Sequence, residues 1–308
     1  MFNLVQKRRW YFRISAVVIL LGLVAIIYSV ITLDTHTPFP LSVDFRSGTR
    51  FVLHFQAPIT ESEIREVFGE FGVTNPSVTR LGQAQDNVWQ IRTEFLATSK
   101  AQAAQDALAE VAAIDTAQTE IDSVSPSVGA EVTRAAMLAV VVAAVAILLF
   151  IVFAFRQVPN SGRYGACAVA AMLHDILVAM GFMSLAGLLF GWEADALFLT
   201  AMLTVIGFSV QDTIVVFDRI RENIPRRKNE DFETVVNRSL LETLHRSLAT
   251  QLNAIFVMVA LLFFGGASIR QFIAVMLVGM VSGTYSSIFN AVPLLVAWHK
   301  GEIPFLKS

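Results

Sequence analysis

The stretch that decides the fold is Ala196–Phe217, which reads ALFLTAMLTVIGFSVQDTIVVF. As a helix it is long enough to cross a hydrocarbon core of roughly 30 Å. It nevertheless contains Asp212, whose short side chain cannot reach the membrane surface. A carboxyl group in that position must be protonated or paired, and both states can be switched. The stretch therefore predicts a membrane-spanning helix with a functional group inside it.

Five further apolar runs have the length of a membrane span. They are Ile14–Leu33, Ala135–Phe155, Tyr164–Phe190, Ser247–Phe264 and Gln271–Trp298. The composition agrees, because 55% of the 308 residues are hydrophobic and only 16% are charged. Soluble domains carry about 25% charged residues. We therefore expect a polytopic α-helical membrane protein with six transmembrane helices.

The first run, residues 14–33, follows a basic segment at residues 1–13. The apolar core of a secretory signal peptide is shorter, roughly 7–15 residues, and a small-residue cleavage site follows it. Residues 29–33 make a poor cleavage site. This run is interpreted as an uncleaved transmembrane helix.

Basic residues are concentrated in alternate connecting segments. They lie in residues 1–13, at Arg156 and Arg163, and in the loop 218–246. The segments between them carry almost none. The positive-inside rule then places the N-terminus, this loop and the C-terminus (residues 299–308) in the cytoplasm. The chain is expected in the cytoplasmic (inner) membrane, with residues 34–134 on the periplasmic side and residues 135–298 forming helices 2–6.

Residues 34–134 have the pattern of a small α+β domain. Thr60 and Glu63 form a capping box that predicts a helix start. The expected elements are a strand at 50–56, a helix at 61–71, strands at 76–81 and 88–93, a helix at 99–112 and a strand at 118–123. This β-α-β-β-α-β order is that of a ferredoxin-like fold. No catalytic grouping or phosphate loop occurs in it, so we interpret it as a docking module.

Polar residues inside the spans are the candidate functional residues, because each is costly there. The third span carries His174 and Asp175. Helical spacing puts Ser209 on the same face as Asp212 in the fourth span. Further polar or small residues at helical spacing are Thr200, Thr204, Gly207 and Gln211 in the fourth span and Arg246, Thr250 and Asn253 in the fifth. For two of them a simpler role stays open: Arg246 can extend to the interface, and His174 can be a satisfied interior histidine.

Other sequence features limit the classes of function. Gly279, Gly283 and Ser287 have the spacing of a close helix-packing surface. The single cysteine, Cys167, excludes an internal disulfide, and no metal or cofactor motif is present. A net charge of -2 and a pI near 6.2 do not favour a nucleic-acid partner.

The run Thr204–Asn223, TVIGFSVQDTIVVFDRIREN, closely resembles the signature of the SecF members of the SecD/SecF family of protein-export membrane proteins. Its last part holds the signature residues Asp218, Arg219, Arg221, Glu222 and Asn223. Weaker similarities occur in the expected order elsewhere. These are Asp44-Phe45 with Gly48-Thr49, Leu173-His174-Asp175, and Arg246-Ser247 with Thr250. The resemblance extends over essentially the whole chain.

The resemblance implies half of a transporter of the resistance-nodulation-division (RND) superfamily that is not an enzyme and has no cofactor. It implies a heterodimer with SecD, which associates with the SecYEG translocon, SecA and YajC in the lipid membrane and promotes export of unfolded polypeptides using the proton motive force. Its proton-coupling residues would be Asp212, Arg246, Asp175 and His174. Ser209, Gln211, Thr250 and Asn253 would support them. A proton on Asp212 would weaken a pairing with Arg246.

This chain departs from the family pattern at several positions. Gln251 and Asn253 stand where the family has Ser and Thr, and Gln211 stands where Asn is more usual. These changes keep the polarity of each helix face. Ser42 and Ser47 replace glycines at the beginning of the external domain, which affects backbone shape there.

Two other functions fit parts of the pattern. Half of a proton-driven RND small-molecule exporter would share the six spans, but it would have a larger external portion and a second six-span half in the same chain. An intramembrane aspartyl protease would use two facing aspartates, for which Asp175 and Asp212 are available. The Tyr-Asp and Gly-x-Gly-Asp motifs of such enzymes are absent.

Overall fold

The computed structural model describes residues 3–33, 35–73, 75–81, 86–156 and 161–303. The chain forms two compact units, one made of Met1–Pro40 and Ala139–Ser308 and the other of Leu41–Leu138. Asp34, the first residue of the predicted external domain, and residues 304–308 of the predicted C-terminal segment lie outside the described residues.

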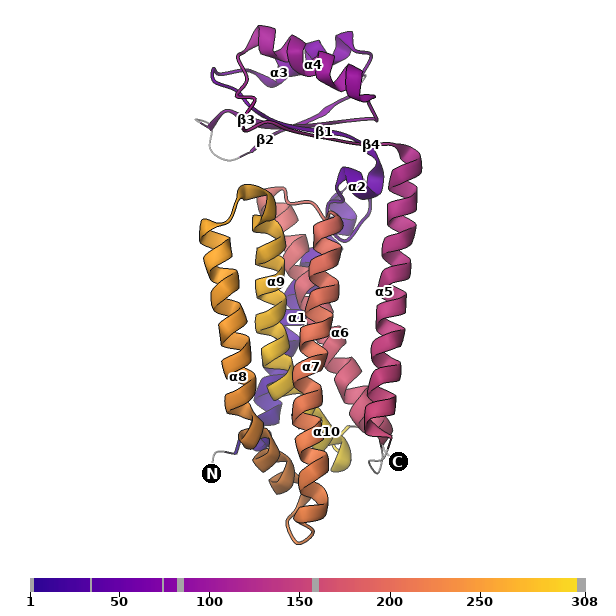
Figure 1. Cartoon of the computed structure of the whole chain (residues 1–308), viewed down its shortest axis with the longest axis vertical. Coiled ribbons are helices and arrows are strands. Elements are labelled where there is room, and N and C mark those ends of the chain that lie inside the picture. Colours follow the sequence, from indigo (N-terminus) through magenta and orange to yellow (C-terminus); the bar gives the residue numbers. More distant parts are fainter. Residues whose placement is uncertain (1–2, 34, 74, 82–85, 157–160, 304–308) are drawn as a thin grey trace. The chain divides into compact units, whose positions relative to one another are not determined.

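Six helices in the described residues are long and apolar enough to cross a membrane, which confirms the predicted number of spans. Each has outward-facing apolar side chains, as a helix in lipid requires. Their bounds, labelled in Figure 1, are α1 Arg8–Thr32, α5 Pro126–Phe155, α6 Ser161–Phe190, α7 Ala196–Arg226, α8 Phe232–Phe264 and a final span made of α9 Ala267–Ser286, the π turn η3 Ser287–Ala291 and α10 Val292–His299. A short 3-10 turn, η1 Val5–Lys7, precedes α1.

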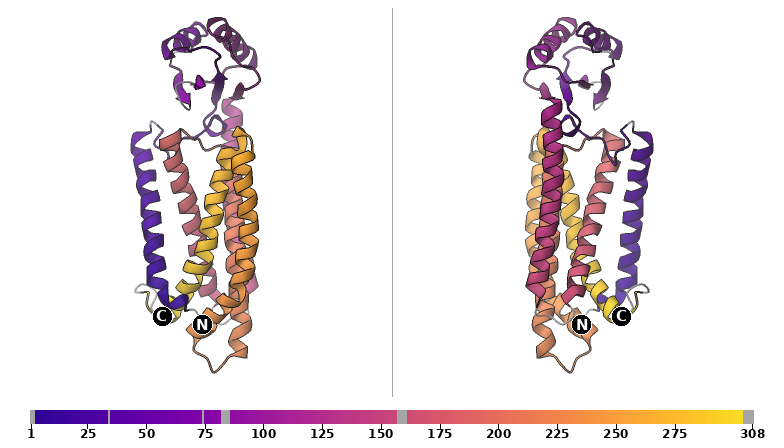
Figure 2. Two further views of the ribbon diagram at one scale, coloured as in Figure 1. Left: turned by 90° about the vertical axis from the view of Figure 1, so that its left-hand side faces the viewer. Right: turned by 90° about the vertical axis from the view of Figure 1, so that its right-hand side faces the viewer.

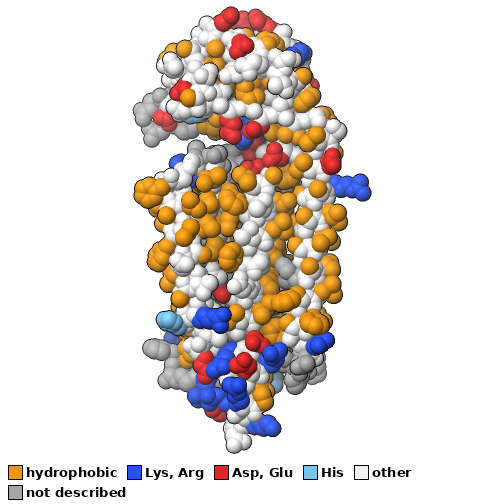
Figure 3. All heavy atoms as spheres, viewed as in Figure 1, with side chains coloured by type: hydrophobic (Ala, Val, Ile, Leu, Met, Phe, Trp, Pro, Cys, Tyr) orange, Lys and Arg blue, Asp and Glu red, His pale blue; other side chains and the backbone are white. Residues whose placement is uncertain are grey.

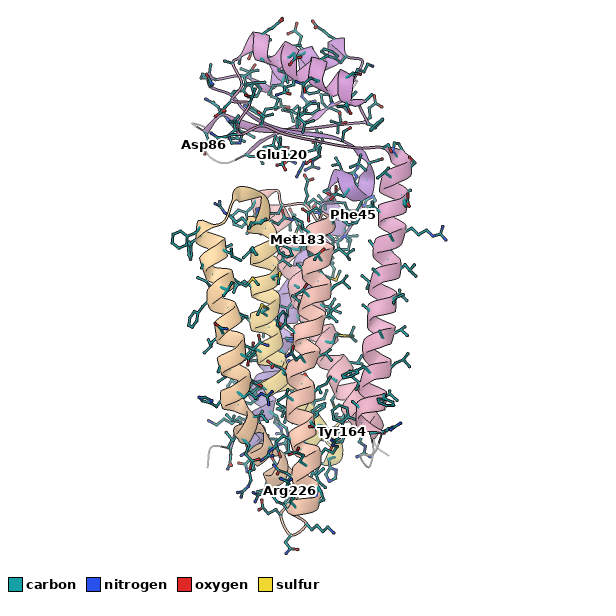
Figure 4. The ribbon with its side chains drawn as sticks, in the orientation of Figure 1. Phe45, Asp86, Glu120, Tyr164, Met183 and Arg226 are labelled. Atoms are coloured by element: carbon teal, nitrogen blue, oxygen red, sulfur yellow. The ribbon has the colours of Figure 1, made fainter. Side chains whose placement is uncertain are left out.

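The segment 218–246, predicted as a loop, is almost entirely helical. Helix α7 continues to Arg226, and α8 begins at Phe232, where the Asp231 side chain accepts a hydrogen bond from the Glu233 N–H at 3.2 Å. The apolar pattern of one span ends at Phe217 and that of the next begins at Ser247, and both helices continue as charged turns between these residues. Lys and Arg side chains gather at this end of α7 and α8 in Figure 3, and Arg226 marks it in Figure 4.

Small residues let the helices of the bundle approach closely. A methyl group at Gly279 on α9 would overlap the Val205 side chain on α7, and one at Gly181 on α6 would lie 2.5 Å from the Gly22 Cα on α1. Figure 2 shows α1 and α6 side by side. The hydrophobic effect does not hold helices together within a bilayer, because lipid tails are themselves apolar. Membrane helices therefore associate through close van der Waals packing of this kind.

The last span is interrupted where it crosses the bundle. Residues Ser287–Ala291 form a π turn, and Pro293 follows without a backbone N–H to donate. The Ser287 hydroxyl donates to the Ser209 carbonyl at 3.1 Å, and Asn290 Oδ1 accepts from Ser15 at 2.9 Å. The irregular turn therefore binds α7 on one side and α1 on the other.

A buried ion cluster joins the two ends of the chain to α8. Arg8, only 8% exposed, donates to Glu233 Oε1 at 2.9 Å and through Nε to Glu302 Oε2 at 2.9 Å. The hydrogen bond from Arg8 lowers the pKa of Glu302. Asn237 Oδ1 accepts from the backbone N–H of Leu4 at 2.9 Å. These contacts fix the beginning of α1 against α8.

The second unit is a four-stranded antiparallel sheet of order β2-β3-β1-β4 with two helices on one face (Figure 1). Its elements are α2 Val43–Arg46, β1 Gly48–His54, α3 Glu61–Glu70, β2 Ser77–Leu81, β3 Val88–Thr93, α4 Thr98–Val111 and β4 Glu120–Val124. Apart from the unpredicted α2, they follow the expected order. The capping box at Thr60 and Glu63 is confirmed. Phe51 and Phe68 meet edge-to-face at 5.1 Å in the core between sheet and helices.

Replacing Gly279 with Ala tests the packing of α9 on α7. The added methyl overlaps Val205, so we expect a loss of about 1–3 kcal/mol in stability. Gly207 on α7 is the matched control, because a methyl there meets nothing within 4 Å and removes backbone entropy worth roughly 0.5–1 kcal/mol. Thermal unfolding in detergent should fall for Gly279→Ala and be unchanged or rise for Gly207→Ala. Equal shifts would contradict the packing.

Candidate functional site

Asp175 on α6 is completely enclosed and accepts four hydrogen bonds. Its Oδ1 accepts from the Ser282 hydroxyl at 2.6 Å and lies 2.9 Å from His174 Nδ1. Its Oδ2 accepts from Ser209 at 2.5 Å and from Ser286 at 2.6 Å. An ionised carboxylate only accepts, and about four donors saturate its lone pairs. The arrangement therefore suits a charged Asp175 that joins α6, α7 and α9.

His174 is the titratable partner of this carboxylate. Its Nδ1 donates to Asp175, and its ring stacks on Tyr285 with centroids 6.2 Å apart. The other ring nitrogen, Nε2, is buried and has no hydrogen-bond partner among the described residues. A proton taken up there would convert the hydrogen bond into an ion pair without breaking it.

Ser282 and Ser286 on α9 were missed by the sequence analysis. They are spaced i, i+4 and interleave with Gly279 and Gly283, so the small-residue stripe and the hydroxyl pair occupy neighbouring positions on one helix. A Cβ at Gly283 would lie 3.7 Å from Asp175 Oδ2, and Gly283 also packs on Ser209. The i, i+4 spacing of these two hydroxyl groups within an apolar span was the feature of the sequence that could have identified them.

Asp212 lies in a different environment. It is 6% exposed, and its Oδ2 accepts one hydrogen bond from Gln251 Nε2 on α8 at 2.8 Å. Ser247, one turn earlier on the same face of α8, is also buried. Among the described residues, the Ser247 hydroxyl and Gln251 Oε1 have no hydrogen-bond partner. Asp212 is thus surrounded by polar groups that are not saturated.

The expected pairing of Asp212 with Arg246 is absent from the described part of the chain. Arg246 is exposed, as are Thr250 and Asn253, and the Thr250 hydroxyl donates to the Arg246 carbonyl at 3.0 Å. Ser247 and Gln251 occupy the face of α8 that meets α7. Arg246 precedes Ser247 by one residue, which turns its side chain about 100° around the helix. The spacing correctly placed Arg246, Thr250 and Asn253 on one face of α8. It did not show that this face is exposed rather than turned toward Asp212.

The two faces of α7 also differ from the expectation. Ser209 does not support Asp212, because its hydroxyl donates to Asp175 across the α6–α7 contact. Gln211 is exposed, in line with Gly207 and Thr200. Helix α7 therefore directs Ser209 toward α6 and α9, Asp212 toward α8, and a polar stripe outward.

The signature residues at the end of α7 form a network with α8. Their ion pairs are Arg219–Glu222 at 2.7 Å, Arg219–Glu242 at 2.6 Å and Arg221–Asp218 at 2.8 Å. Asn223 is buried and donates to Ser239 at 2.9 Å and to Glu242 at 2.8 Å. The signature thus fixes the α7–α8 hairpin just beyond the level of Asp212, which limits how these two helices move.

The six spans and the two buried carboxylates define a multi-pass membrane protein of the transport class. The sequence profile of the family described as "Protein export membrane protein SecD/SecF, C-terminal" matches residues 103–301. "Protein translocase subunit SecF" of Anaerolinea thermophila is 42% identical over 98% of this chain and 96% of that protein. The SecF subunit of Thermobaculum terrenum is 43% identical over 85% of each chain. The chain belongs to the SecF family and is an accessory subunit of Sec protein translocation.

A solved structure shares the architecture. SecDF from Thermus thermophilus, described as a translocon-associated membrane protein, superimposes with a TM-score of 0.78 at 28% identity. The match covers 97% of this chain and 39% of that longer chain. "Protein translocase subunit SecDF" of Bacillus subtilis is 31% identical and is covered over 38% of its length. In these relatives a SecF-like region is part of one longer SecDF chain, so SecF functions in the context of SecD.

The contrast between the two carboxylates predicts different responses to amidation. Asp175→Asn replaces one accepting oxygen with an amide that faces hydrogen-bond donors, so we expect a loss of about 1.5–3 kcal/mol in stability. Asp212→Asn keeps a side-chain oxygen that can accept from the Gln251 amide, so we expect a cost of roughly 1 kcal/mol or less. Thermal unfolding of the purified chain in detergent measures both. Similar losses would show that Asp175 is not held as a saturated anion.

Proposed function

We propose that this SecF subunit uses the proton motive force to promote translocation and release of exported polypeptides across the cytoplasmic membrane, with Asp212 as the group that takes up the proton. One observation carries the proposal. Asp212 is buried within a span, yet among the described residues only the Gln251 amide and the Ser247 hydroxyl beside it act on the carboxyl group, and Gln251 Oε1 has no partner there. A carboxyl group in that position gains and loses a proton with little disturbance of its neighbours.

The proposed switch is the amide of Gln251. While Asp212 is ionised, Gln251 donates to it through Nε2. A protonated Asp212 must itself donate, and rotation of the amide presents Oε1 as the acceptor. Arg246 lies one residue from Ser247, about 100° around α8. A change local to this part of α8, beyond the signature network at Glu242, would exchange amide for guanidinium beside Asp212. One charge crossing 100 mV supplies about 2.3 kcal/mol, which is enough to bias such a two-state arrangement.

His174 and Asp175 have the supporting part in this proposal. The four hydrogen bonds of Asp175 hold α7 against α6 and α9 while α8 changes its contacts. His174 can carry a proton while remaining bonded to Asp175. The pair thus forms the fixed side of the site, and Asp212 with α8 forms the side that moves.

The proposed orientation places residues 1–13, the α7–α8 hairpin and residues 299–308 in the cytoplasm. It is supported by the basic residues at this end of the bundle. Residues 34–134 are then periplasmic. Their strand order, β2-β3-β1-β4 with two helices on one face, supports a ferredoxin-like domain. We propose that it is a non-enzymatic docking module.

The partner surface for SecD is proposed on the outward polar stripes of α7 and α8. Polar side chains on the outer face of a membrane helix are normally satisfied by another protein. The stripes consist of Thr200, Gly207 and Gln211 on α7 and Arg246, Thr250 and Asn253 on α8, all exposed. The heterodimer would act with SecYEG, SecA and YajC on an unfolded exported chain.

The switch is tested by substituting Asp212→Asn and Arg246→Met separately and measuring export into membrane vesicles with and without a proton gradient. Each variant should lose the gradient-dependent part of export while co-purifying with SecD. Asp106→Asn, an exposed aspartate on α4, is the control and should retain the stimulation. Gradient-stimulated export in both variants would remove Asp212 from the mechanism.

The partner surface is tested by disulfide cross-linking in cells. With Cys167 replaced by Ser, Thr250→Cys should cross-link to cysteines placed on the corresponding span of SecD. Val24→Cys, 57% exposed on α1, is the matched control and should remain free. Cross-linking from Val24→Cys alone would place SecD on the other side of the bundle.

A further inference from the structure

The segment from Leu4 to Arg8, here called the N-terminal strap, is bonded to the first two turns of α8. The Leu4 and Val5 N–H groups donate to Asn237 Oδ1 at 2.9 and 3.3 Å. Arg8 donates to Glu233 Oε1 at 2.9 Å, and the Val5 side chain is fully buried. The strap therefore holds one side of α8 through backbone, charge and packing contacts.

The end of the chain reinforces this contact. Arg8 Nε donates to Glu302 Oε2 at 2.9 Å, and Lys300 forms an ion pair with Glu233. The side chains of Arg8 and Glu233 are only 10% and 12% exposed. Removing one member of a buried cluster of this kind leaves a charge without compensation. The strap is therefore kept in place on α8 by a cluster that favours all of its members together.

The opposite side of the same part of α8 is bound to α7. Glu242 lies nine residues beyond Glu233, which is about two and a half turns at 3.6 residues per turn. The two carboxylates therefore lie on opposite sides of the helix. Glu242 pairs with Arg219 at 2.6 Å and accepts a hydrogen bond from Asn223 at 2.8 Å. The first part of α8 is thus held from two sides, which fixes its rotation about its own axis.

Helix α8 continues without a break over Phe232–Phe264. A rotation fixed near Glu233 is therefore carried along the helix to the level of Asp212. There the Gln251 amide donates to Asp212 at 2.8 Å, while Arg246 is exposed. Arg246 and Gln251 are five residues apart, about 140° around the helix at roughly 100° per residue. Only one of them can face Asp212 at a given rotation of α8.

We propose that the N-terminal strap sets the rotation of α8, and that Arg8 is a positioning residue for the contact between Gln251 and Asp212. About 27 Å of helix separates Glu233 from Gln251, at 1.5 Å per residue, so Arg8 acts through α8. The strap and the α7 network confine any change of partner at Asp212 to the part of α8 beyond Glu242. The importance of that contact for export rests on the proposed function, but the position of α8 does not.

A purely stabilising role of the ion cluster predicts a different result. Loss of stability alone would loosen the packing throughout the bundle. A positioning role predicts a change confined to the face of α8 that meets α7. Ser247, 3% exposed on that face, and Cys167, fully buried on α6, distinguish the two.

The accessibility of a cysteine at position 247 tests the proposal. Ser247→Cys is combined with Arg8→Met in the full chain, and labelling by N-ethylmaleimide in detergent is followed by mass spectrometry of the peptides. Loss of charge-assisted hydrogen bonds should raise the labelling rate at position 247 roughly tenfold or more, while the native Cys167 stays protected. Arg8→Lys keeps the positive charge and should restore most of the protection.

Arg13→Met is the matched control. Arg13 is an exposed arginine five residues further along α1, and its guanidinium lies over the Trp10 ring. Its substitution should leave labelling at position 247 unchanged. Glu233→Gln removes the charge on the α8 side of the cluster, and it should raise the labelling rate in the same direction if Arg8→Met does not fold.

Two results would overturn the proposal. Unchanged labelling at position 247 with both Arg8→Met and Glu233→Gln removes the strap from the positioning of α8. An equal rise at position 247 and at Cys167 shows a general loosening of the bundle instead. Both measurements are made without a proton gradient or an exported chain. They therefore fail independently of the export measured with Asp212→Asn.

Discussion

The carboxylate of Asp175 is the constraint on which the rest of the bundle depends. A charge in a low-dielectric interior is tolerated only where donors surround it. Here these donors come from α6, α7 and α9, so the three helices must meet at one point. Gly279 makes that possible, because a methyl group there would overlap Val205 and hold α9 away from α7. The hydrogen bonds to Asp175 therefore form only when α6, α7 and α9 are closely packed.

The second buried carboxyl group, that of Asp212, has fewer hydrogen-bonding partners than Asp175. Asp212 is almost as deeply buried, but among the described residues only Gln251 and the neighbouring Ser247 hydroxyl act on it. Two similar acids in contrasting environments are a common basis for separate functions, one fixed and one that titrates. In this bundle the saturated acid faces the tightly packed helices. The unsaturated acid faces α8, whose outer side is exposed.

The outer surface of the bundle is divided in the same way. On α7 and α8, polar side chains such as Gln211 and Arg246 are exposed, and this is the surface proposed for SecD. On α1, apolar side chains such as Val18 and Val24 are exposed. The proposed partner surface and the apolar surface of α1 therefore lie on different helices. The Asp175 network lies between the two.

The six spans, the order of elements in the α+β unit and the family follow from the amino-acid sequence, because hydropathy, capping and the Thr204–Asn223 signature are local properties of the chain. Asp175 and Asp212 also stand out in the sequence, because each lies within an apolar run long enough to span a membrane. Their hydrogen-bonding partners come from other helices and follow from the packing of the bundle. Helical spacing shows which residues share a face of α8, but the rotation of that helix is set by its neighbours. That rotation brought Gln251 rather than Arg246 to Asp212, and the packing of α9 brought Ser282 and Ser286 to Asp175.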